Sequence, residues 1–144
     1  MFDLDAFLPF RLNLLAERIS RLVQPVYRDS HGLSRAEWRV LAHLGARGHS
    51  TASALIGLTA MDKVKVSRAI SGLETRGWIA RTTDDRDRRI SRLALSPQGR
   101  AALDGLAPVM TAREAEVLAG LNPVQRARLV AALADLEAAL AAAD

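Results

Sequence analysis

The segment STASALIGLTAMDKVKVSRAISGLETRGW, residues 50–78, carries two short helical patterns joined by the three residues Thr-Ala-Met. Ser50 is a suitable N-cap for the first helix, and Asp62 can cap a second helix that runs to Arg76. Gly77 follows, and glycine readily adopts the left-handed conformation in which helices often end. Two helices separated by so short a turn predict a helix-turn-helix unit.

The chain after this unit has strand character in two places, residues 79–82 and 89–95, and Leu93 and Leu95 share one face of the second. Three acids and four arginines fall within residues 84–92, where the two strands would be joined. We therefore expect a β-hairpin with a strongly charged tip. Charged turns are usually just solvated, so the tip by itself does not establish a contact surface.

Helices are also predicted before the helix-turn-helix unit. Apolar residues at spacings of three and four mark a helix over residues 8–26, with Pro9 in its first turn and Pro25 expected to kink or end it. A second helix should start after Ser34, where Glu37 completes a capping box, and should run to about Ala46 and stop near Gly48.

Two more helices should follow the hairpin. Ser96 and Pro97 are N-cap and first-turn residues for one of them, and Asn122 and Pro123 repeat the pattern for the other. Leu129, Leu133, Leu136 and Leu140 form an apolar stripe along the last helix. This stripe, like the apolar stripe of the first helix, is too long to be covered by one small domain. Both are therefore candidates for dimerisation.

The expected fold is mainly α with a small β-hairpin wing. Residues 1–144 would form a single unit, in which residues 31–96 make a winged helix-turn-helix lobe for DNA binding. Residues 1–30 and 97–144 would supply dimerisation helices on either side of the lobe.

Composition narrows the class of protein. There is no apolar run of about 18 residues, the start of the chain is acidic rather than basic, and cysteine is absent. We therefore expect a cytoplasmic protein without disulfides or thiolate metal ligands. No catalytic motif or phosphate-binding glycine loop is visible, so we expect no enzyme. Residues 61–100 hold ten basic and five acidic side chains, a balance that favours contact with a polyanion such as nucleic acid.

The second helix of such a unit enters the major groove of DNA and meets base edges near its N-terminus. Lysine and arginine can read guanine, valine can touch a thymine methyl, and serine can bond a phosphate. An ordinary exposed helix face above buried Val66 and Ile70 is the alternative, and the attached hairpin favours DNA. The candidate contacts are Lys63, Val64, Lys65, Ser67 and Arg68.

The stretches MDKVKVSRAISGLETRGWI, DDRDRR and LALSPQGR resemble the recognition helix, wing and following helix start of the MarR family of bacterial repressors. The resemblance in element order extends from about Leu8 to Leu140. It implies a homodimer with interlocked terminal helices that binds a palindromic operator in double-stranded DNA. It also implies small anionic, often aromatic, effectors that bind between the dimer helices and the DNA-binding lobe.

The resemblance also assigns roles at the charged tip. In family wings an arginine at the tip enters the minor groove, and a nearby aspartate fixes its direction. Asp87 and Arg89 match these positions, and Arg86 and Arg88 are available for phosphates. The narrow minor groove of A·T-rich DNA attracts such an arginine.

The effector is the least constrained part of this interpretation. A pocket needs a few polar groups on apolar helix faces, and Arg11, Asn13, Arg18 and Trp38 qualify, although each also suits a surface or a dimer interface. An architectural or constitutive DNA-binding protein without an effector stays open. A metal-responsive regulator is a weaker alternative, and we expect no metal or other cofactor, because no ligand-type spacing links the three histidines, His31, His43 and His49.

Overall fold

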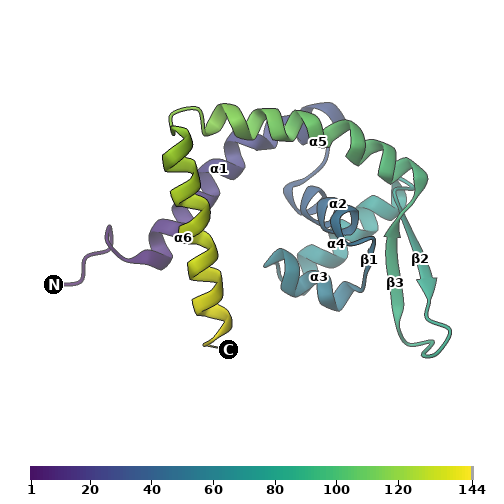
Figure 1. Ribbon diagram of the computed structural model, residues 1–144. Coiled ribbons are helices and arrows are strands. Elements are labelled where there is room, and N and C mark those ends of the chain that lie inside the picture. Colours follow the sequence, from purple (N-terminus) through teal and green to yellow (C-terminus); the bar gives the residue numbers. More distant parts are fainter. Residues whose placement is uncertain (144) are drawn as a thin grey trace.

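The structure is a computed structural model that describes residues 1–143. In that range it contains six helices and one three-stranded sheet, which confirms the predicted mainly α class with a small wing (Figure 1). The elements in chain order are α1 (Leu8–His31), α2 (Arg35–Arg47), β1 (His49–Ser50), α3 (Ala52–Thr59), α4 (Lys63–Thr75), β2 (Ile79–Thr83), β3 (Ser91–Leu95), α5 (Pro97–Val117) and α6 (Pro123–Ala141).

Local capping sets where the helices of the lobe begin and end. The capping box of α2 is confirmed: Ser34 Oγ accepts the N–H of Glu37 at 3.1 Å, and Glu37 Oε2 accepts the N–H of Ser34 at 2.8 Å. Asp62 caps α4, and Gly77 follows that helix with a φ of 71°. Each cap satisfies a backbone N–H that the first turn of a helix leaves without a partner.

One predicted cap is wrong. The hydroxyl of Thr51, and not that of Ser50, caps α3 by accepting the N–H of Ala54 at 3.1 Å. Ser50 lies instead in β1, a strand of two residues that the sequence pattern did not reveal, and it pairs with Leu93 of β3. Pairing with the free edge of β3 holds Ser50 in an extended, buried position, so a tertiary contact overrides its local preference.

Pro25 does not end α1, which was one of the two outcomes expected for it. That proline removes one helical hydrogen bond, yet the helix continues to His31. Tyr27 is 1% exposed and anchors the last turn in the core. The helix ends at Gly32, which has a φ of 63° and donates its N–H to the carbonyl of Arg28 at 2.8 Å.

The sheet has the strand order β1-β3-β2 with both pairings antiparallel. In the hairpin, Ile79 pairs with Leu95 and Thr83 pairs with Ser91. The second strand therefore starts two residues later than predicted, because Arg89 and Ile90 belong to the turn. The hairpin projects beyond the helices of the lobe (Figure 1).

The hydrophobic core is centred on residues 31–96, the predicted lobe, and extends into α1 and α5, so that it draws on five helices and the hairpin. α2 and α4 contribute the most buried side chains, and α1 and α5 each add one. This packing fixes α4 relative to the wing. The buried apolar residues are Tyr27, Leu33, Val40, Leu41, Leu44, Leu55, Val66, Ala69, Ile70, Leu73, Ile79, Leu93 and Leu106.

The outer helices remain largely uncovered. α5 leads away from the lobe to α6, which buries none of its residues in the part of the chain that is described (Figure 1). Leu129, Val130 and Leu133 of α6 are exposed, as are Leu14 and Leu15 of α1. None of the helices within residues 1–143 has the length and apolar character that a membrane crossing requires.

Candidate nucleic-acid interface

The outward face of α4 presents the predicted base-contact residues. α4 buries Val66 and Ile70 toward the core, which turns the remaining side of the helix to solvent. Asp62 fixes the first turn by accepting the N–H of Lys65 at 2.9 Å, and this bond holds the pKa of the Asp62 carboxyl below its usual value. All five predicted contact residues are exposed: Lys63, Val64, Lys65, Ser67 and Arg68.

Asp84 organises the tip of the wing, a role that the sequence pattern did not reveal. Its Oδ1 accepts the N–H groups of Arg86 at 2.8 Å and Asp87 at 3.3 Å. Its Oδ2 accepts hydrogen bonds from Nε and Nη2 of Arg92 on β3, at 3.0 and 2.9 Å. The N–H of Arg86 and then the Arg92 guanidinium hold the pKa of Asp84 below its ordinary value. The tip is therefore an internally bonded turn and not merely a solvated loop.

The structure brings together the predicted pair Asp87 and Arg89, chiefly through the main chain. Asp87 Oδ1 accepts the N–H of Arg89 at 3.0 Å, whereas Nε of Arg89 lies 4.0 Å from the same oxygen. The Arg89 side chain is 95% exposed, and an ion pair so exposed stabilises little. Asp87 thus fixes the backbone from which Arg89 projects. Arg86 and Arg88 are also exposed at the tip.

Arg81 on β2 is a further residue that local patterns did not reveal. Its Nε donates to Oε1 of Glu74, near the end of α4, at 2.8 Å. This ion pair joins the base of the hairpin to α4. No local pattern links the two residues, because the turn at Gly77 separates them.

The structure does not join the four predicted effector residues. Arg11, Asn13 and Arg18 lie on the exposed surface of α1, and within residues 1–143 no hydrogen bond or ion pair links them to Trp38. Trp38 is half-buried on α2 and stacks on Tyr27, with ring centroids 5.5 Å apart.

Arg35 is a polar group at the same α1–α2 junction. Its Nη1 donates to Oε2 of Glu17 at 2.6 Å, which holds the pKa of Glu17 below its usual value. Its Nε is buried and has no hydrogen-bond acceptor among the described residues. The junction therefore carries one buried donor without a hydrogen-bond partner among the described residues.

The three histidines occupy unrelated environments. The ring of His31 lies edge-on to Trp78, His43 is half-buried on α2, where burial lowers its pKa, and His49 is exposed in β1. Across residues 1–143, no group of three or more His, Asp or Glu side chains could hold a metal ion.

Sequence and fold are both similar to those of known transcriptional regulators. The family model described as MarR family matches residues 31–90. A probable transcriptional regulator from Pseudomonas aeruginosa is 30% identical, with a TM-score of 0.77 over 93% of this chain and 99% of its own. A MarR family transcriptional regulator from Silicibacter pomeroyi is also 30% identical, with a TM-score of 0.76 over 93% of this chain and 90% of its own.

A third similar structure is that of BpsR from Bordetella bronchiseptica, whose DNA binding is regulated by 6-hydroxynicotinic acid. It is 26% identical, with a TM-score of 0.80 over 95% of this chain and 97% of its own. No curated protein matches the chain. Because 30% identity extends over nearly the whole length of a known member, and the family model covers the lobe that carries the recognition helix and wing, the chain belongs to the MarR family of transcriptional regulators.

Proposed function

We propose that this protein is a bacterial, cytoplasmic repressor that binds a palindromic operator as a homodimer and is released by a small anionic effector. The observation that carries the proposal is the presence of two exposed cationic elements in one lobe. The N-terminal half of α4 is exposed and would enter a major groove. The hairpin projects beyond the helices of the lobe (Figure 1) and would reach the adjacent minor groove.

The residues of α4 divide by chemistry. Lys65 and Arg68 are the candidates for reading guanine O6 and N7. Val64 is 58% exposed and suits contact with a thymine methyl. Lys63 and Ser67 have the chemistry for further polar contacts with bases or phosphates. At the tip, Arg89 would enter the minor groove.

A homodimer is supported by the uncovered apolar faces of α1 and α6. Monomeric proteins rarely expose apolar surfaces that run along whole helices. We expect a dimer in light scattering, with an interface above the ~1,600 Å² of a standard complex. Leu133→Asp on α6 should shift the protein to monomer, whereas Asp135→Ser on the same helix should not. A monomeric wild-type protein at micromolar concentration would contradict this part of the proposal.

The effector is proposed to be a small aromatic acid. Half-buried Trp38, stacked on Tyr27, supplies an aromatic side chain at the α1–α2 junction, and Nε of Arg35, which has no acceptor among the described residues, is a donor that a carboxylate would satisfy. The regulation of the relative BpsR by 6-hydroxynicotinic acid supports this class of ligand. Arg11, Asn13 and Arg18 remain candidates for any part of the pocket that dimerisation completes.

The first experiment identifies the operator by selecting bound duplexes from a random pool, and a palindromic consensus is expected. Lys65→Ala and Arg68→Ala should then weaken operator binding by about 1–3 kcal/mol and reduce discrimination against a scrambled duplex. Arg100→Ala is the control, because that side chain points to the carbonyl of Gly45 at 3.3 Å. Equal losses on operator and scrambled duplexes would show that these side chains contact only phosphates.

A second experiment tests release. Aromatic carboxylates are added to the complex of protein and operator, and dissociation is followed by fluorescence anisotropy. At least one of these acids should release the DNA from the wild-type protein and release it less effectively from Arg35→Gln. If none of them releases the DNA, the protein is better described as a constitutive DNA-binding protein.

A further inference from the structure

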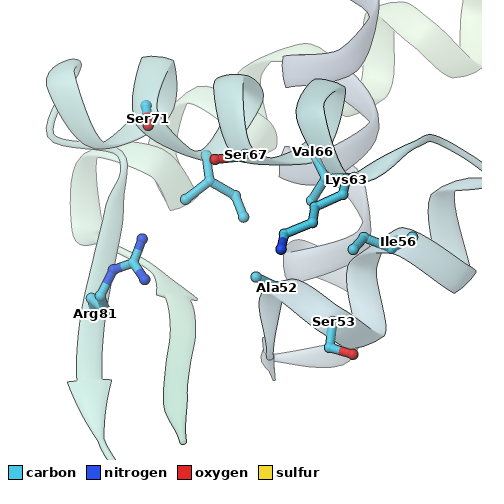
Figure 2. A pocket seen from close by; sticks show the side chains of 9 residues that line it. Ala52, Ser53, Ile56, Lys63, Val66, Ser67, Ser71 and Arg81 are labelled. Carbon is cyan, nitrogen blue, oxygen red and sulfur yellow. The ribbon is translucent and has the colours of Figure 1, made fainter. Parts of the chain in front are cut away.

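A pocket of about 390 Å³ lies between α3, α4 and β2, at the place where the recognition helix meets the base of the wing. Its floor includes the apolar side chains of Ile56, Val66 and Ile70. Figure 2 shows Lys63 from α4 and Arg81 from β2 extending toward the same space from opposite sides. An apolar floor between two cations is complementary to an anionic group that carries a hydrocarbon face.

The two cations differ in how they are held. Nε of Arg81 is engaged by Glu74, and the Arg81 side chain is 48% exposed. Within residues 1–143, its two terminal nitrogens have no hydrogen-bond acceptor and Lys63 has no ion pair. Glu74 therefore fixes the direction of the guanidinium and leaves its outer nitrogens available.

The position of the pocket indicates which anionic group it would bind. On a duplex, one sugar–phosphate strand separates each major groove from the neighbouring minor groove. If α4 occupies the first groove and the hairpin tip the second, that strand must pass between them, alongside the base of the wing, where Arg81 lines the pocket. The phosphate would meet Lys63 and Arg81, and the deoxyribose would cover the apolar floor.

We propose that the pocket between α3, α4 and β2 seats one sugar–phosphate unit of the DNA strand that runs between the recognition helix and the wing, with Arg81 and Lys63 as its phosphate ligands. This inference rests on the proposed DNA binding and adds a binding residue, Arg81, at the wing base. Ser67 and Ser71 also line the pocket, and their hydroxyl groups come from α4, the helix that carries Lys63 (Figure 2).

The test uses a labelled duplex of mixed sequence, because a phosphate contact is independent of base sequence. Binding is measured by fluorescence anisotropy over a series of salt concentrations. Loss of one phosphate contact reduces the magnitude of the slope of log K against log salt by about 0.9, and at 0.1 M salt it lowers affinity about eightfold. In the proposed homodimer both lobes lose the contact, so the slope should change by about 1.8 and affinity should fall about 60-fold. Arg81→Gln should show both effects, and Arg81→Lys, which keeps the charge, should retain the wild-type slope.

Arg21→Gln is the matched control. Arg21 is also exposed and also bonds a glutamate, Glu17 at 2.9 Å, but it lies on α1. Its replacement should leave affinity and slope unchanged. Thermal unfolding of each variant shows whether the fold is intact, and if Arg81→Gln fails to fold, Lys63→Gln at an exposed position provides the same measurement.

The outcomes separate the inference from the function on which it rests. A wild-type protein that binds no duplex at any salt concentration contradicts the proposed function itself. If the wild type binds normally and the folded Arg81→Gln or Lys63→Gln variant has an unchanged salt dependence, the proposal that the pocket holds a sugar–phosphate unit is overturned. Benzoate binding that requires Arg81, together with an unchanged slope, would assign the pocket to a free acid and also overturn the inference.

Discussion

Asp87 can be replaced in two ways that separate its hydrogen bond from its charge. Asp87→Asn keeps an oxygen that can accept the N–H of Arg89, now 3.0 Å away, and removes the negative charge. Asp87→Ala removes both. The resemblance to the MarR family implies that the aspartate directs the arginine. If it does so only by pairing with the guanidinium, the two variants should weaken DNA binding equally.

The geometry of the tip predicts a different result. A pair of unit charges 4.0 Å apart in water interacts by about 1 kcal/mol, and exposed pairs contribute about 0.2–1 kcal/mol. A hydrogen bond contributes about 0.5–1.5 kcal/mol, so the bond to the backbone is at least as important as the ion pair. We expect Asp87→Ala to weaken operator binding by up to about tenfold, since 1.4 kcal/mol corresponds to a factor of ten. Asp87→Asn should bind as tightly as the wild type or more tightly, because an anion near DNA phosphates is removed.

The assay is fluorescence anisotropy with the selected operator at one fixed salt concentration. Asp85→Asn is the control for charge alone, because Asp85 is exposed and makes no hydrogen bond or ion pair among residues 1–143. It should tighten binding slightly. In the Arg89→Ala background the loss from Asp87→Ala should largely vanish, as expected of coupled neighbours. If Asp87→Asn loses as much affinity as Asp87→Ala, the backbone role assigned to this carboxylate is refuted.

Two further predictions concern the fold. A Cβ added at Gly99 of α5 would lie 2.1 Å from the carbonyl oxygen of Trp78, so Gly99→Ala should destabilise the protein by about 1–3 kcal/mol in chemical denaturation. Gly105→Ala on the same helix meets nothing within 4 Å and should be neutral or stabilising by about 0.5–1 kcal/mol, and similar losses at both positions would contradict the packing argument. The lowered pKa of Asp84 means that its contribution to stability is present above the unfolded-state pKa and is lost as pH falls through the folded-state pKa. The amide NMR signals of Arg86 and Asp87 should therefore keep their positions until the pH falls below the ordinary aspartate range, and a transition within that range would show that the tip bonds do not persist in solution.

The helices and the hairpin could be predicted because their signals are local. The capping box at Ser34 and the caps at Asp62 and Asn122 each involve residues three apart, and the structure has all three. A helix can be read from such spacings because its hydrogen bonds close over four residues. The same reasoning placed the five exposed residues of α4 on one surface, since a periodic apolar stripe defines the opposite face.

The rest depended on contacts between segments far apart in the chain. β1 is only two residues long and exists because β3 offers it an edge, so no periodicity could show it, and this pairing displaced Ser50 from its expected cap. The burial of Tyr27 carried α1 past Pro25.

The candidate site also depended partly on contacts between distant segments. Sequence alone determined which side chains are charged and which helix could read DNA, whereas the tertiary structure decided that Asp84 closes the tip through Arg92 and that Arg81 faces the recognition helix. Those contacts span seven or eight residues across a turn, and only the pairing of β2 with β3 and the packing of α4 on the sheet bring them within hydrogen-bonding distance.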